Sequence, residues 1–181
     1  MIVLIIFFAD RYHLRHYSLL ISADDYKGMK LGPVGSATKD ILKEDDFFFS
    51  NVSEEDNQYY HKYLLAKGSF VKAKSTVNYN ELSESEKEAL NFSIKHFGKF
   101  NQFQLADITH DYPEWKKHKE LFDTNIVKRV DMDEIDFLEN PRLQESPYIQ
   151  KYFNGIDPFE EDSDILESIK EDLLEQYSLS Y

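Results

Sequence analysis

The sequence contains no cysteine and little glycine, six residues in 181. The missing cysteine excludes disulfides, thiolate zinc sites, iron–sulfur clusters and cysteine nucleophiles. The glycines form none of the patterns G-x-x-x-x-G-K-[ST], G-x-G-x-x-G or G-x-S-x-G, so neither a phosphate-binding loop nor a nucleophile elbow is supported. We therefore expect no enzymatic activity, no catalytic residue and no cofactor.

Histidine is also scarce, with six residues and no H-x-x-x-H or H-E-x-x-H pair. His13 and His16 stand three apart, a spacing that brings two side chains to one face of a helix. With cysteine absent, histidine and carboxylates are the remaining ligands, and we expect no metal site. One alternative stays open, a metal-dependent hydrolase that uses Asp10, His13 and His110.

The sequence lacks an apolar run long enough to cross a bilayer, since its opening run MIVLIIFFA has only nine residues. That run has no basic residue before it and no small-residue cleavage site after it. We expect neither a signal peptide nor a membrane span, no membrane partner, and a cytoplasmic location. A helix that is apolar on all sides normally lies inside a core, so residues 2–16 are predicted to form a mostly buried helix, with Arg11 and Arg15 on a polar face.

The sequence has fewer basic residues, 21, than acidic residues, 34, and its net charge is −13. Residues 131–181 hold 15 acidic residues against Arg142, Lys151 and Lys170, whereas residues 1–130 are close to neutral. Nucleic-acid binding requires clustered Lys and Arg, and no such stripe occurs, so we expect no nucleic-acid partner. The acidic end suits a basic protein partner, although a purely solubilising role is an open alternative.

Length and periodicity predict an α+β fold, predominantly α-helical with a small antiparallel β-hairpin. At roughly 150 residues per domain we expect one domain, residues 1–130, followed by an acidic helical C-terminal extension, residues 131–181. The hairpin is placed in residues 57–79, with its turn at residues 66–69. The phenylalanine-rich stretch before it, residues 44–56, reads as a partly buried loop or short strand, and short extended pieces are expected around Gly28 and Gly32.

Helices are predicted at several further positions. Ser83 and Glu86 form a capping box at the start of one helix, which Gly98 ends, with Leu90, Ile94 and Phe97 as its apolar stripe. Asp111 is expected to cap a helix that begins near Pro113. Three candidates lie beyond residue 130, at 132–140, 146–155 and 163–178, and the last has an apolar stripe of Ile165, Ile169 and Leu173.

Three short motifs occur in a fixed order along the chain. The first is residues 8–14, FADRYHL; the second lies in DDYKGMKLGPV, and the third in LADITHDYPEW. The residues that carry the second and third are Asp25, Tyr26, Met29, Lys30, Gly32, Pro33, Val34, Leu105, Thr109, His110 and Trp115. With this order, residues 1–120 resemble the Panacea domain of SocA-like antitoxins, a family also known from phages. Two departures are Gly35 in place of a proline and the absence of a helix that usually precedes the first motif.

The resemblance implies a mainly helical domain that works by binding protein. It implies an antitoxin that neutralises a protein toxin encoded by a neighbouring gene, and it allows a protease as a further partner. The acidic tail would suit a toxin that is basic. The expected contacts are exposed motif residues, Asp10, Arg11, His13, Lys30, His110 and Trp115. For Trp115 a place in the core is an equal alternative. A phage or prophage accessory protein without a toxin is the alternative function.

Overall fold

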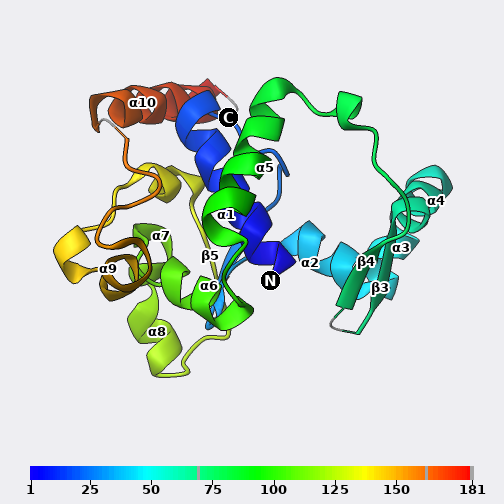
Figure 1. Ribbon diagram of the computed structural model, residues 1–181, viewed down its shortest axis with the longest axis horizontal. Coiled ribbons are helices and arrows are strands. Elements are labelled where there is room, and N and C mark those ends of the chain that lie inside the picture. The colour runs from blue at the N-terminus through cyan, green and yellow to red at the C-terminus, as the bar shows by residue number, and fades with distance from the viewer. Residues whose placement is uncertain (69, 162, 180–181) are drawn as a thin grey trace.

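The computed structural model describes residues 1–68, 70–161 and 163–179, which are mainly helical with two small antiparallel sheets (Figure 1). This confirms the α+β, mostly helical class that the sequence predicts. Among the described residues, no helix combines the length and the apolar character needed to cross a bilayer.

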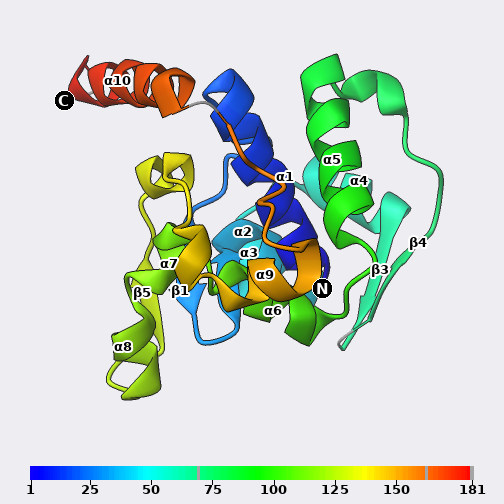
Figure 2. The same ribbon diagram turned by 60° about the vertical axis from the view of Figure 1, so that its left-hand side comes forward.

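Helix α1 (Ile2–Tyr17) runs through the middle of the body and packs along α5 (Glu84–Phe97) (Figures 1 and 2). The Phe8 ring stacks on Phe97 at 3.9 Å between centroids. The prediction of a mostly buried helix is confirmed, but its polar face is wrong, because Arg11 and Arg15 are also buried. Residues 7–15 of α1 are therefore covered on all sides by other parts of the chain.

A three-stranded sheet lies beside α1, with the order β2 (Gly32–Gly35), β1 (Tyr26–Met29) and β5 (Arg129–Asp131). The sequence predicts extended pieces in the first two positions but gives no sign of β5. Gly32 has φ +109°, and a Cβ there would lie 2.7 Å from Thr109 Oγ1. Glycine is therefore required both for the backbone conformation and for the close packing of the β1–β2 turn on α6 (Gln102–Thr109).

Residues 44–82 form an arm that projects from the body beyond α2 (Ser36–Lys43) (Figure 1). The arm contains α3 (Asp46–Ser50), α4 (Glu54–Tyr63), the hairpin strands β3 (Leu64–Lys67) and β4 (Phe70–Ala73), and the 3₁₀ turn η1 (Tyr79–Glu81). The hairpin is confirmed at residues 64–73, with Gly68 at φ +60° in the turn and residue 69 of the predicted turn outside the described residues.

Two predictions in the arm are wrong. Residues 57–63 are the second half of α4 rather than a strand, and the phenylalanine-rich stretch contains α3 rather than a loop or strand. Both helices have N-caps, since the Asp45 side chain accepts a hydrogen bond from Phe48 N and the Ser53 side chain accepts one from Asp56 N. Local capping therefore outweighs the β preference of the aromatic residues.

The capping box of Ser83 and Glu86 is confirmed at the start of α5, and Gly98 follows its last turn. The predicted stripe is only partly right, since Ile94 is 59% exposed and Ala89 and Ser93 are buried together with Phe97. The small residues sit where α1 comes close, and Ser93 Oγ donates to Ile5 O at 2.6 Å. Small side chains are needed at this face of α5 because the two helices pack closely there.

After α6 the chain makes two short helices, α7 (Pro113–Lys116) and α8 (Lys119–Asp123). The predicted N-cap role of Asp111 in α7 is wrong, because Tyr112 is the N-cap residue and makes no side-chain cap. Instead, the Asp111 carboxylate accepts hydrogen bonds from Tyr148 N and Ile149 N, both at 2.7 Å. It thus holds the first turn of α9 (Pro147–Phe153) against the body.

The C-terminal part contains the 3₁₀ turns η2 (Glu134–Leu138) and η3 (Leu143–Glu145), then α9 and α10 (Ser163–Leu179). The predicted helix at 132–140 is therefore only the 3₁₀ turn η2. Among the side chains of α10 that the structure describes, Leu166 and Leu173 are buried and Ile165 is 53% exposed, so the predicted stripe is right at Leu173 and wrong at Ile165.

One hydrophobic cluster joins the two parts of the chain. Besides α1 and α5 it includes side chains from beyond residue 130, namely Phe137, Leu138, Ile149, Phe159, Leu166 and Leu173. The boundary at residue 130 stays a prediction, but the helical segment that follows it is packed into the body's own core.

Candidate functional site

The first motif places Asp10 on the buried side of α1, facing the loop that leads into β1. Its carboxylate accepts hydrogen bonds from Ser22 N at 2.9 Å, from Ser22 Oγ, and from the Tyr26 hydroxyl at 2.6 Å. Burial, followed by the Asp10 charge, raises the pKa of Tyr26 well above its usual range. Asp10 therefore acts as an anchor for residues 22–26, with its oxygens already engaged by donors.

Arg11 joins the first motif to the third through an ion pair inside the protein. Its Nη1 lies 2.5 Å from Glu114 Oε1, and neither side chain has any exposed surface. The guanidinium also lies over the Tyr112 ring at 4.4 Å and donates to Glu139 O at 2.8 Å. Burial raises the pKa of the Glu114 carboxyl, and the positive charge of Arg11 opposes that rise.

Arg15, one turn along α1, binds the C-terminal part of the chain. It donates to Phe137 O at 3.0 Å, to Phe159 O at 2.9 Å and to Asn140 Oδ1 at 2.6 Å. Burial, and then the neighbouring Arg11 charge, lowers the pKa of its guanidinium to about 10, which leaves it charged at neutral pH. A single buried cation on α1 thus binds two later segments of the chain, residues 137–140 and residue 159.

The second and third motifs meet at Trp115. Its indole Nε1 donates to Met29 O at 2.7 Å, and the His110 ring stacks on it at 3.6 Å between centroids. Burial lowers the pKa of His110 to about 4, so the ring is neutral at physiological pH. Lys30 is exposed and its Nζ lies 3.4 Å from Asn125 Oδ1.

The three motifs therefore converge, but they converge inside the protein. Of the six predicted contact residues, Lys30 is exposed and His110 is half-buried. The exposure assumed for Asp10, Arg11 and His13 is wrong because all three are buried, and for Trp115 the alternative of a place in the core is confirmed. His13 has both ring nitrogens engaged, Nδ1 at 2.7 Å from Leu19 O and Nε2 at 3.1 Å from Ser85 Oγ. Asp10, His13 and His110 do not form a ligand cluster in the described part of the chain.

The sequence pattern indicates neither Glu114 as the partner of Arg11 nor the role of Arg15. One signal was present in the sequence, because two arginines one turn apart in a helix that is predicted to be mostly buried must find buried partners. The identity of those partners required the fold, since Glu114 is 103 residues away from Arg11.

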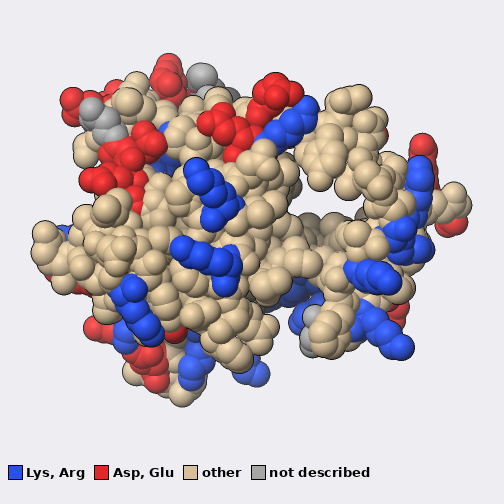
Figure 3. All heavy atoms as spheres, in the orientation of Figure 1, with Lys and Arg blue, Asp and Glu red and all other residues tan. Residues whose placement is uncertain are grey.

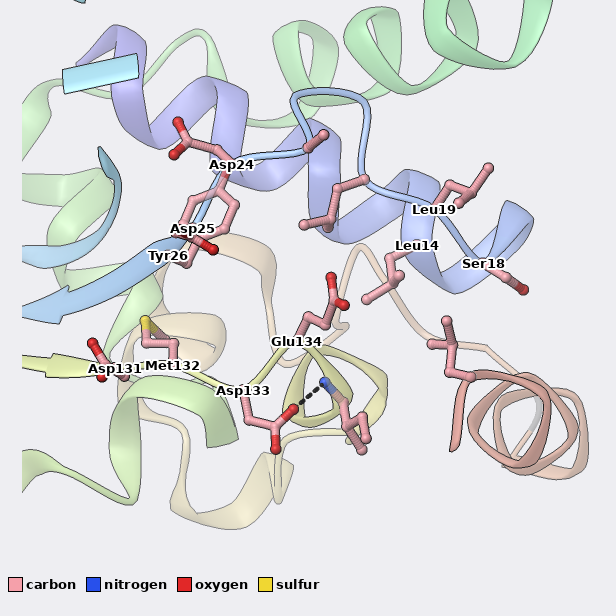
Figure 4. A pocket seen from close by; sticks show the side chains of 14 residues that line it. Leu14, Ser18, Leu19, Asp24, Asp25, Tyr26, Asp131, Met132, Asp133 and Glu134 are labelled. Atoms are coloured by element: carbon pink, nitrogen blue, oxygen red, sulfur yellow. Dashed lines mark hydrogen bonds between the residues drawn. The ribbon is translucent and has the colours of Figure 1, made fainter. Parts of the chain in front are cut away.

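An acidic groove of about 850 Å³ opens beside this network, between the end of α1, the loop before β1, the β5–η2 segment and α10 (Figure 4). Its apolar lining comes from Leu14, Leu19, Leu20, Met132, Ile135 and Leu173. Five carboxylate residues also line it, and among its described lining residues there is no Lys, Arg or His; the five are Asp24, Asp25, Asp131, Asp133 and Glu134.

Three of these carboxylates already have partners within the chain. Asp24 caps α2 by accepting from Ala37 N at 2.9 Å and Thr38 N at 2.7 Å. Asp131 pairs with Lys27 at 2.7 Å, and Asp133 accepts from Ile135 N at 3.0 Å. Burial, and then repulsion from Asp133, Asp10 and Asp25, raises the pKa of Glu134. The groove therefore carries a negative potential that a cationic group would relieve.

Comparison with known proteins gives one family. The model of the "Antitoxin SocA-like, Panacea domain" family matches residues 4–116, which include the three motifs and the Arg11–Glu114 pair. Searches of the curated proteins and of the solved structures find no match.

Proposed function

The chain belongs to the family of SocA-like antitoxins with the Panacea domain, and on this premise we propose that it neutralises a cognate protein toxin, encoded by a neighbouring gene, by binding it directly. The observation that carries the proposal is the family match over residues 4–116. Because most of the motif residues are buried, their role in this proposal is to hold the binding surface in shape rather than to touch the toxin.

A binding role without catalysis agrees with the hydrogen bonds that Asp10 and His13 of the first motif already make within the chain. Asp10 accepts three hydrogen bonds, and His13 has both ring nitrogens engaged, so neither is poised to exchange a proton with a substrate. Delivery of the toxin to a protease, and action in the cytoplasm, belong to the same proposal and rest on the family alone.

We assign the toxin contact to the acidic groove, with a basic segment of the toxin as its occupant. The groove offers apolar surface from Leu19, Leu20 and Ile135 beneath carboxylates such as Asp25 and Glu134. A basic segment would bury apolar side chains there and pair with the carboxylates, and the negative potential would speed the encounter. Opposite charge also discriminates against acidic proteins that are not partners.

The test is co-expression with the adjacent gene. We expect the neighbour to arrest growth when expressed alone, and the chain to restore growth and to co-purify with it. Asp25→Lys combined with Glu134→Lys should abolish both effects, whereas Glu55→Lys with Glu120→Lys, which makes the same charge change at exposed positions outside the groove, should not.

The results of this experiment test the antitoxin role and the assignment of the toxin to the groove separately. A neighbour that is harmless, or that is not neutralised by the chain, overturns the antitoxin role and favours an accessory protein without a toxin. Full rescue by the groove variant would leave the antitoxin role intact and overturn only the assignment of the toxin to the groove.

A further inference from the structure

The arm, residues 44–82, has almost no core of its own. Among its described residues only Ala66 is buried, although it contains many aromatic side chains. It is joined to the body mainly through α2, where the Tyr60 hydroxyl donates to Ile41 O at 2.9 Å. Figure 3 shows the surface hollowed between the arm and the body. A segment of this composition gains stability when another surface covers it.

The hairpin in the arm has two different faces. Residues directly opposite in the β3–β4 pair share a face, and the register pairs Leu65 with Lys72 and Lys67 with Phe70. This outer face is exposed, with Phe70 81% and Leu65 48% exposed. The other face carries Leu64, Ala66 and Val71 and is the more buried one. The outer face therefore presents two apolar side chains and two lysines to solvent.

The charge of the hairpin is opposite to that of the rest of the molecule. The hairpin, residues 64–73, contains Lys67 and Lys72 and no acidic residue, and Lys62 and Lys74 flank it, in a chain whose net charge is −13. Figure 3 shows Lys and Arg side chains along the arm and a concentration of Asp and Glu side chains over the region of α10. The partner that fits the outer face has apolar surface bordered by carboxylates.

The acidic groove of this same chain has that chemistry, with leucines, Met132 and Ile135 among five acidic residues. A hairpin cannot reach the groove of its own molecule, because the two views place it on the far side of α1 and α5 from β5 and α10 (Figures 1 and 2). We propose that, in the absence of the toxin, the outer hairpin face of one copy, Leu65, Lys67, Phe70 and Lys72, docks in the acidic groove of a second copy, and that the toxin segment assigned to this groove above displaces it.

Salt screening and the size of the groove support docking of a second copy, although both copies carry the same negative net charge. At physiological ionic strength the Debye length is about 8 Å, so salt screens the overall repulsion but acts less on lysine–carboxylate pairs at contact distance. The groove volume of about 850 Å³ lies in the range of clefts that hold a drug-sized ligand, so the groove has room for side chains of the outer hairpin face. Because the two surfaces differ, the contact is heterologous and is reciprocal in a dimer or repeated in a ring.

The test uses the purified full chain without a toxin, so it does not depend on the proposed function. We expect light scattering to give a mass above the monomer that rises with concentration. Lys67→Glu with Lys72→Glu should weaken self-association by at least about tenfold, since like charges would then face each other. The control, Lys95→Glu with Lys128→Glu, makes the same charge change at exposed positions away from the hairpin and should leave association unchanged.

Mixing two variants makes the test specific. The groove variant Asp25→Lys with Glu134→Lys should also be monomeric by itself, and circular dichroism should show that every variant keeps its helical content. An equimolar mixture of the hairpin and groove variants should associate again, because each charge-reversed surface then meets an oppositely charged one and each unchanged surface meets its original partner.

Three results would overturn the proposal. They are a monomeric wild-type chain at all concentrations, association that survives the hairpin substitutions, and a mixture that stays monomeric. Loss of growth rescue by the hairpin variant, with self-association unchanged, would instead show that the outer face binds the toxin, which also overturns docking to a second copy.

Discussion

At the scale of single residues, the buried Arg11–Glu114 pair is the most sensitive point in the protein. Arg11→Met leaves the Glu114 carboxylate buried without its cation, and we expect a loss of about 3–5 kcal/mol in the free energy of unfolding. A second substitution, Glu114→Gln, should recover most of this loss because no charge then remains buried. Denaturant unfolding of the two variants measures both values.

The same variant has a defined pH dependence. Burial already raises the pKa of Glu114, and removal of Arg11 raises it further, so the fold favours the protonated carboxyl. Arg11→Met should therefore be most stable below the unfolded-state pKa of about 4.3 and lose stability as pH rises through the folded-state pKa. Equal destabilisation at pH 4 and pH 7, relative to the wild type, would contradict this account.

His110 gives a pH dependence of the opposite sign. Its pKa is lowered from 6.5 to about 4 by burial, so the unfolded chain binds the proton more strongly than the folded protein does. The stability due to this ring is fully present above pH 6.5 and is lost as pH falls towards 4, by roughly 1–2 kcal/mol after allowance for solvent screening.

His110→Phe is the test of that dependence, since phenylalanine can stack on Trp115 without binding a proton. We expect the difference in unfolding free energy between wild type and variant to change between pH 4.5 and pH 7. The same comparison with the exposed His61→Phe serves as the control. A constant difference for His110→Phe across this range would exclude the proposed effect.

At the scale of elements, two glycines with positive φ form a matched pair. Gly32 has Thr109 Oγ1 at 2.7 Å from the place a Cβ would take, whereas Gly68 has no atom within 4 Å. Gly68→Ala should cost about 1 kcal/mol for its backbone conformation alone, and Gly32→Ala about 2–3 kcal/mol because packing on α6 is also disturbed. Thermal unfolding of the two variants measures both losses. Equal losses of unfolding free energy would contradict this prediction.

Local signals predicted many elements, whereas the failures have both local and long-range causes. The Ser83–Glu86 box and Gly98 define α5 within a few residues, and helix α1 follows from its apolar composition. Helix α3 was missed because three consecutive phenylalanines favour a strand when the cap at Asp45 is disregarded. Strand β5 was missed because its pairing with β1 joins residues about a hundred positions apart.

The candidate site was harder to predict than the elements. The motif residues were correctly singled out, but their burial was not, because a charged side chain is expected at the surface unless its partner is known. Glu114 and the carbonyls that bind Arg15 come together only in the folded chain. The groove likewise combines three separate segments, residues 14–26, residues 131–135 and Leu173, and no one of them indicates it.

At the scale of the whole molecule, we predict that α10 is part of the same cooperative unit as the body. Leu173 is buried in the core and lines the groove, whereas its neighbour Leu174 is 48% exposed. Leu173→Ala should cost about 2–4 kcal/mol and Leu174→Ala less than about 1 kcal/mol, with one transition retained in each case. A separate early transition in the Leu173→Ala variant would show instead that α10 unfolds independently.

The position of Arg15 also sets the order of events during synthesis. Its carbonyl partners lie 122 and 144 residues later in the chain, so at 5–20 residues per second they leave the ribosome roughly 6–30 seconds after α1 does. Until then the Arg15 guanidinium lacks these carbonyl partners, and α1 cannot be fully enclosed. Translation that stops before residue 159 therefore yields a fragment without its native centre, and the supply of functional protein depends on nearly complete chains.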